Sequence, residues 1–117
     1  MLVIRPEQIA VFSEAAVQNF EDWMLAHLER FFPEECAESG EAKIRRRIRD
    51  GTSRAATYGI TSKRDVCKFI DLIMMLGPDF ASDPRFPWAT EILERPVDSA
   101  SKIAGLTDYI ESALGNA

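Results

Sequence analysis

Apolar side chains recur at every third or fourth position along the first 32 residues, a spacing that predicts a long amphipathic helix. Pro6 stands where such a helix can begin, because the first turn needs no N–H from that residue, and Pro33 would end it. The second half is apolar over more than one stripe, which predicts contact with two neighbouring elements. The apolar positions are Ile9, Phe12, Ala16, Phe20, Trp23, Met24, Leu25, His27, Leu28, Phe31 and Phe32.

A polar, acidic connector is expected at residues 33–40 and a second helix at residues 39–58. Gly51 and the two polar residues after it weaken the middle of this helix. Gly59 follows at the position where helices commonly end on a residue in the left-handed conformation. The inner side of the helix is thin and consists of Ile44, Ile48, Ala55 and Tyr58.

The third helix is predicted to be the most apolar of the chain. Thr61 or Ser62 can cap its beginning, and Ser62 with Asp65 three residues later fits a capping box. Gly77 and Pro78 stop the helix. Because only Asp71 interrupts its last apolar run, we expect this helix at the centre of the fold. Its apolar members are Val66, Phe69, Ile70, Ile73, Met74 and Leu76.

A loop rich in proline and aromatic residues follows at residues 78–88, and a short helix is expected at residues 87–94, before Pro96. Asp98 or Ser99 can cap the last helix. The apolar stripe of that helix is Ile103, Leu106, Tyr109, Ile110 and Leu114, and Gly115 closes it.

No segment shows the sustained two-residue alternation of a strand, so the predicted fold class is all-α. We expect a compact bundle of four main helices plus one short helix, forming a single domain over residues 1–117. A composition of 46% hydrophobic and 28% charged residues is ordinary for a globular protein. No apolar run approaches the length of a signal-peptide core or a membrane span, which favours a cytoplasmic location.

The charge of the chain is strongly segregated. Residues 42–64 carry eight basic side chains and one acidic side chain, whereas residues 1–41 carry nine acids and two bases. Residues 65–117 carry nine acids and four bases, and the formal net charge is −5. The basic segment indicates where an anionic partner, or the acidic helices of the protein itself, would dock. The candidate partner-binding cations of this segment are Lys43, Arg45, Arg46, Arg47 and Arg49.

A nucleic-acid-binding regulator that uses the basic helix, residues 43–54, is an alternative interpretation. The second and third helices with the tight turn between them resemble a helix-turn-helix, but Arg54 and Asp65 stand at positions that should be apolar. The third helix is also too apolar to lie in a DNA groove, and the whole chain is acidic. A solvated basic helix, paired in part with acids of the first helix and the connector, or a protein-binding surface is favoured.

The candidate catalytic and metal-binding residues do not form a recognisable motif. His27, the only histidine, lies in the apolar stripe of the first helix, and nothing in the sequence places Cys67 beside it. Cys36 and Cys67 are expected to be free thiols, since two cysteines and one histidine are too few ligands for a zinc site at these spacings. The glycines do not form a phosphate-binding loop. We therefore expect no enzymatic activity, cofactor or metal.

The aromatic loop is the second candidate interface. Prolines stiffen its backbone, so docking its side chains would cost little ordering entropy. The alternative is that some of the aromatic rings fold back and cover the end of the bundle. The candidate contact residues are Phe80, Arg85, Phe86 and Trp88.

Three stretches of the chain resemble a family of small helical bacterial proteins encoded beside type VI secretion spike, effector and effector-chaperone genes. The resemblance covers roughly residues 20–94. It is carried by Phe20-Glu21-Asp22-Trp23-Met24, His27-Leu28, Phe32-Pro33, Tyr58-Gly59-Ile60, Arg64-Asp65-Val66, Asp71-Leu72, Leu76-Gly77-Pro78-Asp79-Phe80, Asp83-Pro84 and Pro87-Trp88-Ala89. It implies an accessory role in loading or chaperoning an effector, and it brings no catalytic motif.

The expected function is that of a non-enzymatic adaptor or co-chaperone whose partner is an effector chaperone, an effector or a spike protein. Two alternatives remain open: the nucleic-acid-binding regulator, and an immunity protein that binds a toxin. Nucleic acid and membrane are not expected as partners, and a homo-oligomer is compatible with the sequence.

Overall fold

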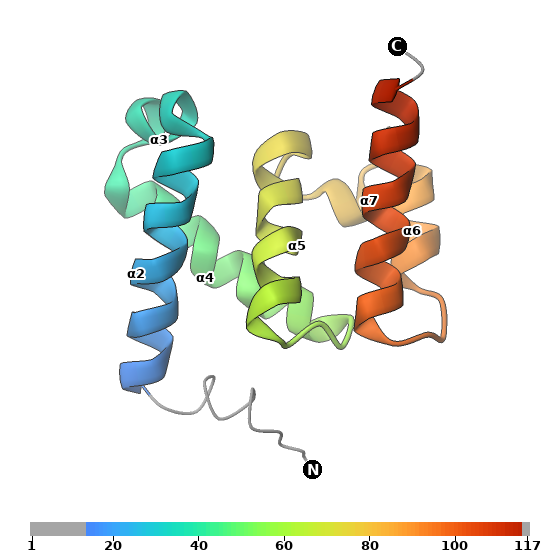
Figure 1. Ribbon diagram of the computed structural model, residues 1–117, viewed down its shortest axis with the longest axis horizontal. Coiled ribbons are helices and arrows are strands. Elements are labelled where there is room, and N and C mark those ends of the chain that lie inside the picture. Colours follow the sequence, from blue (N-terminus) through green and yellow to red (C-terminus); the bar gives the residue numbers. More distant parts are fainter. Residues whose placement is uncertain (1–13, 116–117) are drawn as a thin grey trace.

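The computed structural model describes residues 14–115, and this part of the chain contains helices and no strand (Figure 1). The expectations for Pro6, Ile9 and Phe12 lie outside the described residues. Four helices are long and two have seven residues each. The elements are α2 (Glu14–Phe31), α3 (Pro33–Ser39), α4 (Glu41–Thr57), α5 (Lys63–Leu76), a 3₁₀ turn η1 (Phe80–Ser82), α6 (Pro87–Leu93) and α7 (Ser99–Gly115).

The helix ends follow the signals in the sequence. The Ser62 hydroxyl accepts a hydrogen bond of 3.2 Å from the backbone N–H of Asp65 at the start of α5. Asp98 accepts one of 3.0 Å from the N–H of Ser101 at the start of α7. Gly59 and Gly77, which follow α4 and α5, have φ angles of +78° and +109°, a region that strongly favours glycine.

The expected connector at residues 33–40 is wrong, because α3 occupies most of it. Pro33 ends α2 and also begins α3, where its fixed φ and missing N–H suit the first helical turn. Glu34 and Glu35 place negative charge at the positive end of the helix dipole. The fold therefore has two short helices, α3 and α6, instead of the single one expected.

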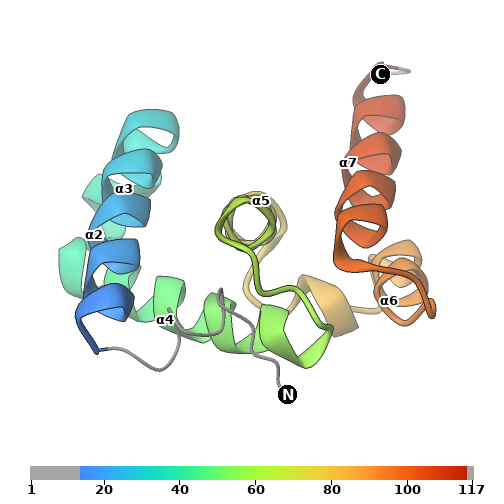
Figure 2. The ribbon, with the colours of Figure 1, turned by 60° about the horizontal axis from the view of Figure 1, so that its bottom comes forward.

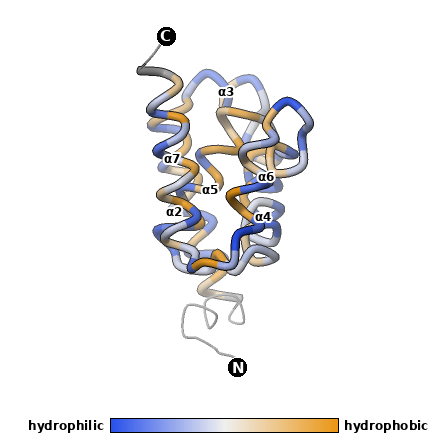
Figure 3. Tube along the Cα trace, turned by 90° about the vertical axis from the view of Figure 1, so that its right-hand side faces the viewer, coloured by the Kyte–Doolittle hydropathy of each residue, from blue (hydrophilic) through white to orange (hydrophobic). Residues whose placement is uncertain are grey.

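Helix α5 lies at the centre of the fold, as predicted. Helices α2, α5 and α7 run side by side with α5 in the middle (Figure 1). Helix α4 runs below α2 and α5, and α7 packs against α5 and α6 (Figure 2). Helix α5 packs against α4, α7, α2 and η1. Each helix mixes apolar with polar positions, as an amphipathic element does (Figure 3). Six side chains of α5 are buried. The buried side chains are Val66, Cys67, Phe69, Ile70, Leu72 and Ile73.

The molecule is flat, with extents of 42 × 38 × 21 Å, because the three upright helices form a single layer. Within the described residues, no helix is long and apolar enough to cross a membrane.

Gly51 explains how α4 and α5 approach so closely. The residue is buried in the middle of α4, and a Cβ atom there would lie 2.9 Å from Ile70 Cγ1 and 2.9 Å from Ile73 Cδ1. The glycine weakens α4 as an isolated helix, but packing against α5 holds the helix continuous through it.

Replacement of Gly51 by valine should destabilise the protein by about 1–3 kcal/mol, since the added side chain overpacks the contact with α5. Urea unfolding followed by circular dichroism measures the change. Ser53→Val, on the exposed side of the same helix, is the matched control and should change stability by no more than about 0.5 kcal/mol. Equal effects of the two variants would contradict the close packing at Gly51.

Candidate functional site

One flank of the basic helix is already occupied by acids of the same chain. Arg45 lies 2.9 Å from a carboxylate oxygen of Asp22 and 2.9 Å from one of Glu41. Arg49 lies 2.9 Å from Glu21, whose residue exposure is only 2%. These pairs tie α4 to α2, as the sequence suggested for part of the basic segment. Arg45 is therefore largely engaged within the chain, whereas the Arg49 side chain holds Glu21 and still remains 62% exposed.

The other flank of α4 keeps its charge. Lys43 and Arg46 are exposed and Arg47 is half-buried. Among the described residues, none of the three forms an ion pair. Arg54, farther along α4, binds Asp79 and the carbonyl of Pro78 and so holds the loop after α5. Of the five candidate cations, Lys43, Arg46 and Arg47 therefore remain without an ion pair among the described residues.

The aromatic loop is largely folded onto the helices. Phe80, expected to contact a partner, is only 1% exposed and packs against Phe69 at a ring separation of 5.2 Å. That expectation is wrong, because η1 turns Phe80 inward over α5. Trp88 is half-buried and stacks on Tyr109 of α7 with ring centroids 4.3 Å apart. Phe86, also half-buried, packs edge-on against Trp88.

Arg85 is the most accessible of the expected contact residues in this loop. Its guanidinium forms an ion pair of 2.9 Å with Asp83, two residues earlier, and lies over the ring of Phe86. The Arg85 guanidinium lowers the pKa of the Asp83 carboxyl through this hydrogen bond. The Arg85 side chain therefore contacts Asp83 and Phe86 within the loop itself.

Trp88→Ala should lower the free energy of unfolding by about 1–3 kcal/mol, less than the ~3–5 kcal/mol of a fully buried aromatic residue, because part of the ring reaches solvent. Trp23→Ala is the matched control. Its ring is 42% exposed, and its loss should cost less than about 1 kcal/mol. Thermal and urea unfolding would measure the difference. An unchanged melting temperature for Trp88→Ala would instead support the interpretation that the loop is a surface free to contact a partner.

An aromatic row on α2 forms a surface that sequence reasoning assigned to the core. Phe20, Trp23, His27 and Phe31 follow one another at spacings of three and four, with ring centroids 6.1, 5.8 and 4.8 Å apart. Trp23 and Phe31 remain 42% and 58% exposed. The core is filled by the neighbouring stripe of Met24, Leu25 and Leu28. The sequence signal for this surface was that apolar residues occupy more than one stripe in the second half of the helix, so that one stripe could fill the core and another could stay exposed.

Cations border the aromatic row. The ammonium group of Lys63 lies 4.3 Å from the centre of the Trp23 ring, and the Arg30 guanidinium lies 5.3 Å from that of Phe31. Arg64 and Lys68 lie beside them, on the first turns of α5. We call this surface the α2–α5 face. Phe31 joins it through its ring contact with His27, and Met75 lies one turn beyond Asp71 on the same side of α5. The face comprises Trp23, His27, Phe31, Lys63, Arg64, Cys67, Lys68, Asp71 and Met75.

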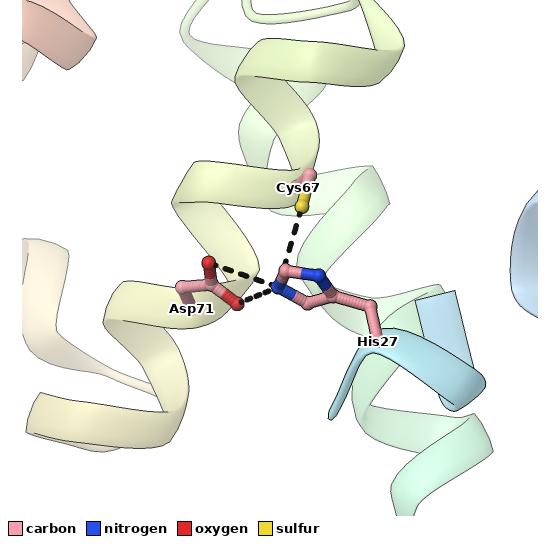
Figure 4. A group of neighbouring side chains, drawn as sticks. All are labelled: His27, Cys67 and Asp71. Carbon is pink, nitrogen blue, oxygen red and sulfur yellow. Dashed lines mark hydrogen bonds and ion pairs between the residues drawn. The ribbon is translucent and has the colours of Figure 1, made fainter. Parts of the chain in front are cut away.

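Three potential ligand side chains meet in a depression of this face (Figure 4). His27 Nε2 lies 2.9 and 3.2 Å from the two carboxylate oxygens of Asp71, and 3.6 Å from the sulfur of Cys67. His27 comes from α2, whereas Cys67 and Asp71 lie one turn apart on α5. The sequence contained no sign of the contact between the helices, but the four-residue spacing of Cys67 and Asp71 was visible.

The arrangement does not activate the thiol for nucleophilic catalysis. A Cys–His–Asp triad uses both imidazole nitrogens, one toward the acid and one toward the thiol. In this site the same nitrogen, Nε2, faces both groups. Burial, reinforced by the negative charge of Asp71, raises the pKa of Cys67 to about 11, and burial also raises the pKa of Asp71. The thiol is therefore protonated at neutral pH and is a poor nucleophile.

Alkylation of Cys67 by iodoacetamide should be slow. The experiment uses a Cys36→Ser variant treated with a chelator, so that Cys67 is the only cysteine and carries no metal. At pH 8 its alkylation rate should be on the order of a hundredfold below that of free cysteine. The reason is that the thiolate fraction falls tenfold for each pH unit below the pKa. Asp71→Asn removes a charge that raises the pKa of Cys67 and should speed the reaction. Mass spectrometry over time measures both rates, and rapid labelling at pH 7 would reveal an activated thiol.

No protein-family model, no curated protein and no solved structure matches this chain.

Proposed function

We propose that this protein is a non-enzymatic adaptor that binds a protein partner through the α2–α5 face. The observation that carries the proposal is the exposure of three large apolar side chains along this face. Trp23, Phe31 and Met75 are 42%, 58% and 49% exposed. Burial of such side chains releases free energy in proportion to their apolar area, and tryptophan is enriched among the residues that dominate binding.

The charges on the face define the chemistry of the partner. Lys63 and Arg64 are exposed and Lys68 is half-buried, and all three lie beside the aromatic row. The best complement is an amphipathic segment with apolar anchors for the row and acidic side chains for the cations. Steering by these cations would be strongest at low salt.

The resemblance to proteins encoded beside type VI secretion genes suggests where to seek such a partner. We propose an effector chaperone, an effector or a spike protein, met in the cytoplasm. An immunity protein that covers a toxin would use the same kind of surface, and the identity of the bound protein distinguishes the two roles.

The nucleic-acid-binding alternative has less support. It requires a free basic helix, but Arg45 and Arg49 are paired with acids of α2 and α4. It also requires an accessible α5, most of whose apolar side chains lie in the core. Lys43, Arg46 and Arg47 alone are a small electrostatic footprint for a phosphate backbone.

The double variant Trp23→Ala/Phe31→Ala should lose the partner and keep its fold. Each variant would be co-expressed with a tagged candidate effector chaperone, effector or spike protein, and the affinity of the purified pair would be measured by calorimetry. Loss of central anchors should weaken binding by more than about 2 kcal/mol, roughly thirtyfold. Val97→Ala removes another exposed apolar side chain, located outside this face, and should bind as the wild type does.

Two charge reversals separate the α2–α5 face from the free flank of α4. Lys63→Glu/Lys68→Glu should weaken binding and reduce its dependence on salt, whereas Lys43→Glu/Arg46→Glu should leave both unchanged. The opposite pattern would assign the interface to α4. Tight binding of the wild type to duplex DNA near physiological salt, lost in Lys43→Glu/Arg46→Glu, would instead support the regulator.

A further inference from the structure

We propose that His27, Cys67 and Asp71 form a zinc-binding site. The inference goes beyond the adaptor function and does not depend on it, because the site is built entirely from side chains of this chain. One ligand atom from each of the three residues can be chosen so that all lie within 4.8 Å of one another. This proposal revises the expectation, drawn from the sequence, that the protein binds no metal.

The thiol of Cys67 and the carboxylate of Asp71 converge on one nitrogen of His27. A metal ion requires its ligand atoms to point at a common centre, and His27 Nε2 points at both the Asp71 carboxylate and the Cys67 sulfur (Figure 4). The arrangement that fails as a catalytic triad is therefore the one that a metal needs. The other imidazole nitrogen is left for the proton, so Nε2 can offer its lone pair.

The distances are close to those of a zinc centre. Zinc bonds of about 2.0 Å to nitrogen and oxygen and about 2.3 Å to sulfur place tetrahedral ligand atoms roughly 3.3–3.6 Å apart. The distance from His27 Nε2 to Cys67 Sγ is already 3.6 Å. The distances from Nε2 to the Asp71 oxygens, 2.9 and 3.2 Å, need to open by only a few tenths of an ångström. The third pair, the Cys67 sulfur and an Asp71 oxygen, lies within 4.8 Å and has to close by up to about 1.3 Å. Rotation of these two side chains on α5 toward each other would therefore be needed to admit the ion.

The ligands are carried by regular elements that limit their movement. Cys67 and Asp71 are one turn apart on α5, so both project from the same side of this central helix. The imidazole of His27 is held between the ring of Trp23, stacked at 5.8 Å with planes 16° apart, and the ring of Phe31 at 4.8 Å. Such preorganisation reduces the entropy lost when the metal binds.

The ligand types favour a metal ion of intermediate hardness. Thiolate, imidazole and carboxylate together suit Zn²⁺, whereas Mg²⁺ and Ca²⁺ prefer oxygen ligands alone. On binding, the Cys67 thiol gives its proton to solvent and its sulfur bonds to zinc, so one thiolate and one carboxylate balance the charge of the ion. With three protein ligands, the zinc ion would take a water molecule as its fourth ligand.

The test uses the full chain, freed of metal with a chelator and titrated with Zn²⁺ against a chromophoric competitor at pH 7. We expect one zinc per chain and a rise of the melting temperature with zinc. Cys67→Ser and His27→Ala should each weaken zinc binding by at least about tenfold, since groups that merely orient a ligand already contribute 10- to 100-fold. Cys36→Ser retains the three ligands and is the matched control, which should bind as the wild type does.

Substitution with Co²⁺ identifies the ligands even where a variant alters stability. The wild type and Cys36→Ser should show a thiolate-to-cobalt charge-transfer band and the intense visible bands of a tetrahedral centre, and Cys67→Ser should lose the former. Circular dichroism of each metal-free variant checks that it is folded. Absence of stoichiometric zinc binding, a cobalt spectrum without the thiolate band, or equal weakening by Cys36→Ser would overturn the site.

Discussion

The contact between α4 and α5 is the constraint on which the rest of the structure depends. Helix α5 is too apolar to stand at a surface, and its burial requires a close partner along its length. Gly51 provides that partner by letting the backbone of α4 approach Ile70 and Ile73. Once α5 is fixed on α4, the neighbours α2 and α7 can cover only its two sides. A flat molecule with an upright layer of three helices results.

Electrostatics then decide how α2 lies on α4. Glu21 is buried and paired with Arg49, and Asp22 pairs with Arg45 at the surface. The buried Glu21 carboxylate lies 2.9 Å from Arg49 and 3.5 Å from Arg45, so a shift of α2 along α4 would leave it without these partners. That position brings the aromatic row of α2 beside α5. The charge segregation along the chain therefore serves in part to hold α2 on α4, while Lys43, Arg46 and Arg47 form no ion pair among the described residues.

The α2–α5 face brings together three kinds of side chain that can take part in binding. Exposed rings, cations stacked on two of them, and a histidine beside a thiol and a carboxylate occupy adjacent turns of two helices. A metal at the three ligands would join α2 to α5 along a line where the helices otherwise touch only briefly. It would also stiffen the surface offered to a partner, which reduces the entropy cost of docking.

The sequence by itself determined the helical class, the four long helices and most of their ends, because these depend on local rules of periodicity and capping. Ser62, Gly59 and Gly77 act as expected, since a cap involves only residues within a turn of one another. Helix α3 was missed because its few apolar residues show no clear stripe.

Only the tertiary structure decided which of the two apolar stripes on α2 entered the core and that Phe80 turned inward. It also decided that His27 contacts Cys67 and Asp71, which lie 40 and 44 positions away in the sequence. Such choices depend on where other helices lie, and no local pattern carries that information.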